Sequence, residues 1–321
     1  MVIDKLIRPK IALAPMMKVT TPCFRKLIQL IAPTTILYTE MITASTIINL
    51  NDEKLQITLG NPDNQTVVQI GGSNPKDIVN AIKRLKQCGW RLFNLNCGCP
   101  STRVQKGMFG AILMKYKELV IEIINTVYIE TQIILSIKCR TGIDEFDSYE
   151  FLKEFIESIS KNTPCNIFYI HARKCWLQGI NPKQNRNIPP LNYDYIFRIK
   201  KEFPHLFIGI NGGITYNSYL KYKFQMDTCD GIMIGREAIK NPLIFAEIIN
   251  MPINIQYIIQ SYFKFIEMSN FTIYKILYPL CNLRRGKPNS KHFKQMINQL
   301  LHNKLITVNE LSNVLLPFFI D

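Results

Sequence analysis

The sequence lacks any long apolar run. Its N-terminal stretch, MVIDKLIRPKIALAPMM, holds only a short apolar segment that Arg8, Pro9 and Lys10 interrupt. Such a segment is too short for the hydrophobic region of a secretory signal or for a membrane span. We therefore expect a soluble, cytoplasmic protein with no membrane partner.

The chain also lacks the cysteine spacing of a metal site. Its nine cysteines are scattered, and none forms the C-x-x-C pair that structural zinc sites use. An odd number of thiols is typical of a reducing cytosol rather than of a disulfide framework. We expect free thiols and no metal.

Acidic residues are scarce relative to basic ones. The 321 residues include 39 Lys and Arg against 24 Asp and Glu, which gives a formal net charge of +15. A field of this sign attracts polyanions such as nucleic acid. Because Lys, Ile and Asn are all abundant, as in proteins from AT-rich genomes, the charge alone does not decide whether nucleic acid is bound.

Eight short apolar or β-branched runs recur along the first three quarters of the chain. They are IALAP from residue 11, ILYTE from 36, TVVQI from 66, RLFNLN from 91, QIILSIK from 132, NIFYIHA from 166, LFIGIN from 206 and GIMIG from 231. Continuous apolar runs are typical of strands buried on both faces, and each interval leaves room for one helix. The pattern predicts an α/β protein with a (β/α)8 TIM barrel over residues 1–241.

A doubly wound sheet is the competing α/β fold. It would carry a glycine fingerprint after its first strand. Here that strand ends instead in Ala14, Pro15, Met16 and Met17, which favours the barrel.

From Pro242 onward the sequence has no convincing strand. The stretches INIQYIIQSYFKFIEM and SKHFKQMINQLLHNKL repeat apolar residues at the spacing of amphipathic helices. We expect a helical bundle domain over residues 242–321, with these apolar positions as its core.

Polar residues at the ends of the barrel strands are the first candidates for function, because TIM barrels build their active sites there. The candidates are Pro15 to Met17, Glu40, Gln69, Asn96 with Cys99, Lys138 with Arg140, His171 with Arg173, Asn211 to Gly213, and Gly235 with Arg236. The last two ends place glycine amides where barrels commonly bind phosphate, and Arg236 adds a charged contact. A tight turn is the alternative explanation for either glycine loop alone.

The other strand ends suit a flavin ring. Gln69 offers an acceptor and donors for the imide edge of the ring. Lys138 can place positive charge beside the ring atoms that become anionic on reduction, the alternative being a salt bridge to Glu40. The role of His171 stays open, because a histidine at a strand end is often a satisfied core residue.

Cys99 lies between Gly98 and Pro100 in the loop after the fourth predicted strand. A sharp loop of this kind points its side chain into the mouth of the barrel, whereas Cys97 continues the strand and is predicted to be buried. A small buried hydrophobe is the ordinary interpretation of a cysteine. The loop favours a functional role for Cys99.

Three ordered segments resemble the tRNA-dihydrouridine synthases: NLNCGCPSTRVQKGMFGA, IKCRTGIDEFDSY and HARKCWLQGINPKQNRNIPPLNYDYIFRIKKEFPHL. The third is most similar to the A-type bacterial subfamily, and the resemblance runs from IALAPMM to the helical tail. It implies an FMN-containing barrel that uses NADPH to reduce the C5–C6 double bond of uridine in the tRNA D-loop. The expected target is position 20, with 20a as a further candidate, and Cys99 matches the acid that protonates C5.

The resemblance also implies binding roles. The residues expected to hold FMN are Pro15, Met16, Met17, Gln69, Lys138, His171, Asn211, Gly212, Gly213, Gly235 and Arg236. Asn96 is expected near the target uracil, which must be flipped out of the tRNA to reach the flavin. The residues expected to orient the tRNA are Lys183, Arg186, Asn282 and Arg285. The protein is expected to act as a monomer.

Two segments depart from the family pattern. The family usually has acidic residues near the positions of Lys18 and Thr21, and it tends toward glycine and Arg-Trp types near Asn289 and Lys291 to Phe293. Both departures bear on tRNA docking rather than on Cys99.

Two other functions remain open. One is a flavin barrel that reduces a free pyrimidine, as dihydroorotate and dihydropyrimidine dehydrogenases act on free pyrimidines. The other is a non-catalytic tRNA-binding or tRNA-folding protein that has kept the barrel. The basic segments LRRGKPNSKHFK and PKQNR favour an RNA substrate over a free base.

Overall fold

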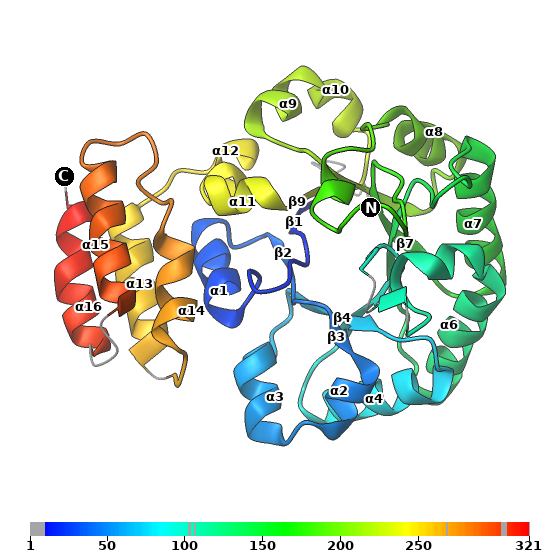
Figure 1. The fold of residues 1–321 in the computed structure, drawn as a ribbon, viewed down its shortest axis with the longest axis horizontal. Coiled ribbons are helices and arrows are strands. Elements are labelled where there is room, and N and C mark those ends of the chain that lie inside the picture. Colours follow the sequence, from blue (N-terminus) through cyan, green and yellow to red (C-terminus); the bar gives the residue numbers. More distant parts are fainter. Residues whose placement is uncertain (1–9, 102–103, 106, 268, 303–306, 321) are drawn as a thin grey trace, which may run out of the picture.

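A computed structural model describes residues 10–101, 104–105, 107–267, 269–302 and 307–320. Within these ranges, eight parallel strands form a closed ring that helices surround (Figure 1). The barrel strands are β1 Lys10–Leu13, β2 Ile36–Tyr38, β4 Thr66–Gly71, β5 Leu92–Asn96, β6 Ser136–Arg140, β7 Ile167–His171, β8 Phe207–Asn211 and β9 Gly231–Ile234. The ring closes because β2 pairs with both β1 and β4. The predicted TIM barrel is confirmed.

Two details of the sheet differ from the predicted strands. A two-residue strand, β3 (Ile42–Thr43), pairs with the end of β4. The run predicted from residue 132 pairs only from Ser136, because the preceding helix, α6 (Lys117–Thr131), ends in Gln132 with a left-handed φ of 58°. The residues between Gln132 and Ser136 connect α6 to β6.

Helices cover the outside of the ring. They are α1 Pro22–Ile31, α2 Ala44–Asn49, α3 Asp52–Leu59, α4 Pro75–Gln87, α6, α7 Tyr149–Asn162, α8 Asp194–Glu202, α9 Tyr216–Lys221, α10 Lys223–Met226, α11 Arg236–Lys240 and α12 Ile244–Ile249, with short 3-10 helices at Gly110–Lys115 and Gln184–Arg186. Thr21 caps α1 by accepting a hydrogen bond from the Phe24 amide at 3.4 Å. Because Asp and Thr are both favoured as helix caps, threonine keeps this local role near the position where an acidic residue was expected.

The interior of the barrel below its mouth is filled by side chains. Alternate strand residues point inward, and they gather there as a small apolar cluster of Ala12, Ala14, Tyr38, Val67, Tyr169 and Met233. The Tyr169 ring lies across two glycines: a Cβ would stand 2.3 Å from the ring at Gly209 and 2.7 Å from its hydroxyl at Gly231. The floor beneath the mouth is therefore packed, and it is not a channel.

The C-terminal helices stand at one side of the barrel and pack against α1 (Figure 1). They are α13 Ile255–Glu267, α14 Ile273–Leu277, α15 Ser290–His302 and α16 Val308–Leu315, with 3-10 helices at Tyr278–Leu280 and Leu316–Phe319. The two predicted long helices are thus confirmed, and the described chain has no strand after β9. Because α12 contacts α9, α11 and α1, the division at residue 241 stays a prediction.

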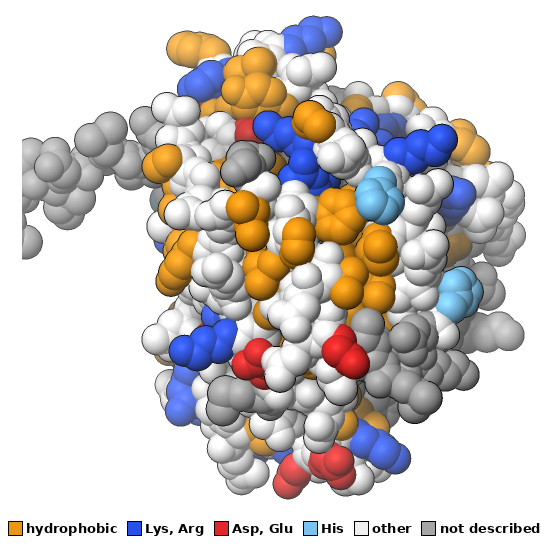
Figure 2. Space-filling view, turned by 90° about the vertical axis from the view of Figure 1, so that its left-hand side faces the viewer, with side chains coloured by type: hydrophobic (Ala, Val, Ile, Leu, Met, Phe, Trp, Pro, Cys, Tyr) orange, Lys and Arg blue, Asp and Glu red, His pale blue; other side chains and the backbone are white. Residues whose placement is uncertain are grey.

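The outer face of the C-terminal helices is chemically mixed. Figure 2 shows hydrophobic side chains in the middle of this face and Lys and Arg side chains mainly toward its upper edge. None of the described helices combines the length and apolarity that a membrane crossing demands.

Candidate functional site

A layer of polar side chains lies above the apolar floor at the carboxyl ends of the strands. Strand register places Gln69 beside Asn94 and Asn96 beside Lys138. It likewise places His171 beside Asn211. The barrel therefore brings together five of the predicted site residues, namely Gln69, Asn96, Lys138, His171 and Asn211.

The loop that carries Cys99 is held from both sides. The side-chain oxygen of Asn96 accepts hydrogen bonds from the amides of Gly98, at 3.1 Å, and Cys99, at 2.9 Å. The carbonyl of Cys99 accepts one from the Ala111 amide at 2.9 Å. The Cys99 side chain is half-buried, and its Sγ lies 3.7 Å from Ser101 Oγ.

The two cysteines of the loop lie in different environments. Cys97 is fully buried, as predicted. Burial, with Cys139 and Cys165 nearby, raises the pKa of the Cys97 thiol well above its ordinary value. Cys97 therefore has no access to a ligand at the mouth, which leaves Cys99 as the accessible thiol of this loop.

Arg140 also holds this loop through hydrogen bonds. Its Nε donates to the Gly98 carbonyl at 2.8 Å, and its Nη1 donates to the carbonyls of Lys174 and Asn185 at 3.1 and 3.2 Å. Burial lowers the pKa of this guanidinium. Arg140 thus ties the Cys99 loop to the loop after β7.

Lys138 has a neutral partner. Its Nζ donates to Asn211 Oδ1 at 3.1 Å, and Asn211 Nδ2 donates to the Met233 carbonyl at 2.7 Å. Burial lowers the pKa of Lys138 to about 8, and Arg140 adds to the effect. In the described part of the chain Lys138 makes no ion pair, and the Glu40 carboxylate accepts from the Lys18 amide instead. The alternative of a Lys138–Glu40 salt bridge is therefore wrong.

His171 is a neutral and unpaired imidazole. Burial lowers its pKa well below the ordinary value, and Arg140, Lys138, Arg173 and Arg236 lower it further. No described residue forms a hydrogen bond with its ring. The alternative of a satisfied core histidine is therefore wrong, and the ring keeps its hydrogen-bonding capacity for a ligand.

Two glycines beside His171 have conformations that other residues rarely adopt. Gly212 has a φ of 121° and Gly213 a φ of 63°, and a Cβ on Gly212 would stand 2.7 Å from the His171 ring. Across the described residues, no acceptor takes the amides of Gly212, Gly213 or Gly235. These free amides are suited to an anion.

None of the described carboxylates balances the cations at the mouth. Lys138, Arg140, Arg173 and Arg236 each have a pKa lowered by burial first and then by a neighbouring cation. No Asp or Glu of the described chain is among the groups that act on these four or on His171. Arg173 Nε is also buried without a partner. Uncompensated positive charge of this kind calls for an anionic ligand.

The first loop forms the part of the rim next to the end of β9. Pro15 and Met16 are half-buried, whereas Met17 is 60% exposed. A Cβ on Gly235 would reach only ordinary contact with Met16 Sδ, at 3.8 Å. The residues predicted to hold a cofactor therefore border the mouth from both the first and the last strand.

The side chains of the predicted tRNA-orienting residues differ in whether they already have a hydrogen-bond partner within the protein. Lys183, Arg186 and Arg285 are exposed, and none of their side chains has a partner in the described structure. Asn282 instead donates to the Ile239 carbonyl at 2.8 Å. Arg236 is also occupied, because it donates to the Arg186 carbonyl at 2.9 Å and to the Asn187 side chain.

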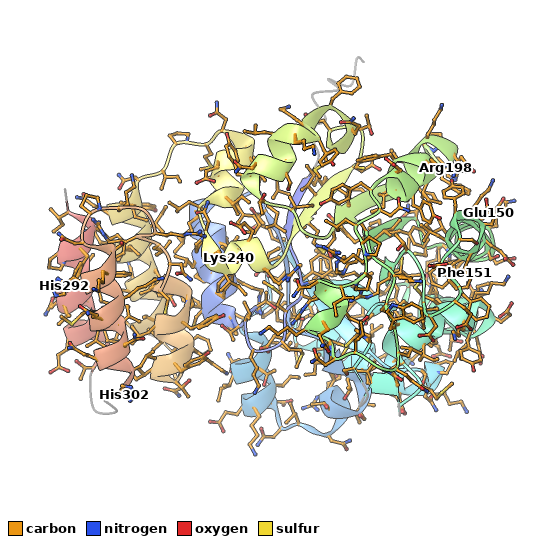
Figure 3. The ribbon with its side chains drawn as sticks, turned by 45° about the horizontal axis from the view of Figure 1, so that its top comes forward. Glu150, Phe151, Arg198, Lys240, His292 and His302 are labelled. Carbon is orange, nitrogen blue, oxygen red and sulfur yellow. The ribbon has the colours of Figure 1, made fainter. Side chains whose placement is uncertain are left out.

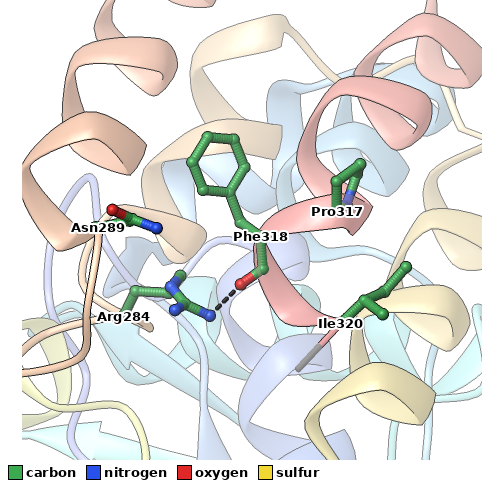
Figure 4. Close-up of a pocket in the computed structure, with 5 residues that line it drawn as sticks. All are labelled: Arg284, Asn289, Pro317, Phe318 and Ile320. Carbon is green, nitrogen blue, oxygen red and sulfur yellow. Dashed lines mark hydrogen bonds between the residues drawn. The ribbon is translucent and has the colours of Figure 1, made fainter.

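Arg284 and Arg285 are neighbours with different surroundings. Arg284 donates to the carbonyls of Phe318 and Pro288 and borders a pocket lined also by Asn289, Pro317 and Ile320 (Figure 4). It therefore fastens the end of the tail. Figure 3 shows Lys240 between the barrel and these helices, with His292 and His302 at the C-terminal side.

The atypical tail residues have structural roles. Asn289 has a left-handed φ of 60°, which asparagine tolerates better than most residues and which glycine adopts freely. Phe293 is fully buried, with its ring 5.3 Å from that of Phe318 and 5.4 Å from that of Phe319.

Two residues of the polar layer were not predicted. Asn94 and Ser136 lie one layer below the strand ends, and both are buried and hydrogen-bonded to each other at 2.9 Å. Asn94 lies two residues before Asn96 and so on the same face of β5. The sequence N-L-N at residues 94–96 could have predicted this, because it places the Asn94 side chain on the same face as that of Asn96.

Comparisons with known proteins agree on one family. The model of the dihydrouridine synthase (Dus) family matches residues 12–313. A tRNA-dihydrouridine(20/20a) synthase from Vibrio cholerae is 43% identical over 239 residues, which cover 74% of this chain and 72% of that protein. The protein of the same name from Escherichia coli strain K12 is 35% identical over 316 residues, covering 95% and 90%.

Among solved structures, morphinone reductase in complex with tetrahydroNAD aligns with a TM-score of 0.49 and 10% identity, covering 76% of this chain and 88% of that one. Likeness at this level supports no conclusion about ligand or reaction.

Proposed function

Since the chain belongs to the dihydrouridine synthase family, which reduces uridine to dihydrouridine, we propose that its substrates are uridines of the tRNA D-loop. Position 20 is the first target and 20a the second. The cofactor is FMN and the reductant NADPH. The protein acts as a cytoplasmic monomer, in keeping with a tRNA substrate.

The donor set at the mouth fits FMN. The free amides of Gly212, Gly213 and Gly235, with Arg236 beside them, suit a phosphate monoester. Lys138 suits the ring edge that gains negative charge on reduction. The uncompensated cations of the mouth are the observation that carries this assignment, because they supply the charge that such a cofactor needs.

Cys99 holds the proton of the reaction. FMN, when bound and reduced, would supply a hydride to C6 of the uracil. Negative charge then builds on the C5–C4–O4 enolate, and the Cys99 S–H donates its proton to C5. The thiol must keep its proton until that moment and regains it from solvent afterwards. Asn96, which fixes the Cys99 amide, lies beside the uracil.

The tRNA is oriented by exposed cations on two separate segments. Lys183 and Arg186 lie on the loop after β7, and Arg285 lies on the C-terminal helical domain of residues 242–321. Asn282 acts indirectly, because its carbonyl accepts the Arg285 amide at 3.1 Å and its side chain anchors that turn to α11. Phosphate contacts from these residues hold the D-loop over the mouth while the target base is flipped.

The test is reduction of tRNA by the purified protein. Protein supplied with FMN and NADPH is incubated with unmodified tRNA, and dihydrouridine is mapped position by position by mass spectrometry. We expect product at position 20 first. Protein that cannot be loaded with FMN, yet still binds tRNA, would instead identify a non-catalytic tRNA-binding protein.

A free-pyrimidine reductase is the second candidate, and free uracil and orotate serve as its test substrates in the same assay. The exposed cations on two segments favour RNA, because a free base needs no phosphate contacts. Faster turnover of a free pyrimidine than of tRNA would reverse the assignment.

A further inference from the structure

A continuous chain of buried side-chain hydrogen bonds runs beneath the Cys99 loop. Ser136 Oγ accepts from Asn94 Nδ2 at 2.9 Å, and Asn94 Oδ1 accepts from Gln69 Nε2 at 2.8 Å. Gln69 Oε1 then accepts from Asn96 Nδ2 at 2.7 Å. All four side chains are buried. We refer to Ser136, Asn94, Gln69 and Asn96 as the amide chain.

The direction of the amide chain is fixed at both ends. The amides of Gly98 and Cys99 can only donate, so the Asn96 atom that they contact must be its oxygen. At the other end the Phe93 carbonyl can only accept, so the Ser136 hydroxyl donates to it, at 3.1 Å. Side-chain amides are often ambiguous in orientation, but here each one must point its nitrogen toward Ser136.

This direction decides what the chain offers to a ligand. The nitrogens of Gln69 and Asn96 each use one hydrogen inside the chain and keep a second one. If the amide chain ran in the opposite direction, the free N–H and the free oxygen lone pair of Gln69 would change places. The imide edge of a uracil or of a flavin alternates acceptor, donor and acceptor. A reversed Gln69 would therefore place a donor opposite a donor, or an acceptor opposite an acceptor.

We propose that Asn94 and Ser136 are positioning residues for the dihydrouridine synthase reaction. They hold the end of the amide chain that lies farthest from Cys99, and they thereby steady the donor that Gln69 presents at the mouth and, through Asn96, the Cys99 loop. The identity of the ligands rests on the proposed function, whereas the effect on the Cys99 loop is independent of it.

The test compares two replacements of Asn94. Asn94→Leu removes the acceptor of Gln69 Nε2, so the Gln69 amide is held at its oxygen alone, by Asn96. Asn94→Asp keeps an acceptor oxygen for that nitrogen. We expect the leucine variant to bind oxidised FMN about tenfold more weakly than wild type, as loss of one buried hydrogen bond would cause, and the aspartate variant to lie between the two.

A second readout requires neither cofactor nor tRNA. The rate of Cys99 alkylation by iodoacetamide in the flavin-free protein is followed by peptide mass mapping, with the exposed Cys88 as the internal reference. We expect Asn94→Leu to raise the Cys99 rate severalfold relative to Cys88. Ser136→Ala should change it in the same direction by less, because Asn94 still accepts the hydrogen bond from Gln69.

Thr66→Val is the matched control. Thr66 is buried on the same strand as Gln69, and its hydroxyl donates to Asp63 at 2.7 Å outside the amide chain. The control should lose stability without a change in Cys99 alkylation or FMN affinity.

Two results would overturn the proposal. If Asn94→Leu matched Thr66→Val in both readouts, Asn94 would be a structural residue only. If Asn94→Asp bound FMN more weakly than Asn94→Leu, the direction of the chain would be wrong. Failure of the proposed function is recognised separately, since wild-type protein would then neither bind FMN nor reduce tRNA while the alkylation result still stood.

Discussion

Lys138 Nζ donates to Asn211 Oδ1 across 3.1 Å, so a half-buried cation at the mouth has a neutral amide as its partner. A carboxylate in that place would have offset the cost of burying the charge. The amide leaves the charge available to a ligand, and the low pKa of Lys138 is the measurable consequence.

The first prediction concerns pH and stability. The folded, flavin-free protein holds Lys138 with a pKa of about 8, against 10.5 for an ordinary lysine. Between these values the unfolded chain binds a proton that the folded chain has lost, so this group raises the free energy of unfolding as pH rises. Between pH 7 and 9 we expect a gain of about 1 kcal/mol for wild type over Lys138→Met. Urea unfolding at the two pH values measures it, and parallel pH profiles of the two proteins would contradict it.

The second prediction concerns the acid. Cys99→Ala should bind FMN and tRNA normally and lose about 100-fold or more in dihydrouridine formation, as loss of a general acid does. Cys97→Ala is the control, because this buried neighbour should affect stability rather than turnover. Single-turnover reaction with pre-reduced protein separates the proton step from reduction by NADPH. Equal rates for Cys99→Ala and wild type would move the acid elsewhere.

The third prediction separates two adjacent arginines. Arg285→Ala should weaken tRNA binding and reduce the slope of log affinity against log salt by about one, with little change in Tm. Arg284→Ala should lower Tm instead, because it removes donors to the carbonyls of Phe318 and Pro288. Salt-dependent binding and thermal unfolding of both variants decide the matter. An unchanged salt slope in Arg285→Ala would exclude that residue from the contact surface.

The fourth prediction uses two glycines of similar backbone conformation. Gly110 and Gly286 have φ values of 74° and 76°, but a Cβ on Gly110 would stand 2.6 Å from the Cys99 carbonyl whereas one on Gly286 would meet nothing within 4 Å. Gly286→Ala should cost about 1 kcal/mol of stability through backbone strain alone. Gly110→Ala should cost more and also lower turnover about tenfold or more by displacing the Cys99 loop. Similar turnover in the two variants would show that the loop tolerates the shift.

The barrel could be predicted because parallel strands buried on both faces read as apolar runs, and the eight runs all became strands. The two-residue β3 is too short for any such signal. The partner of Lys138 could not be foreseen, because it depends on which inward side chains meet across the barrel. Asn94 and Ser136 were missed for a related reason: a polar residue inside a strand gives no sign of its neighbours until the register is known.

The Tyr169 side chain lies against Gly209 and Gly231. The residues at these three positions, on three different strands, should therefore change together in evolution. While the aromatic ring is kept, a methyl group at Gly209 has no room. Loss of the ring alone would leave a void that its neighbours could fill only by growing. Proteins that descend from this chain should therefore keep the aromatic residue together with both glycines, or replace all three by residues of intermediate size. Substitutions at these positions of β7, β8 and β9 should be coupled, because the total side-chain volume must stay nearly constant.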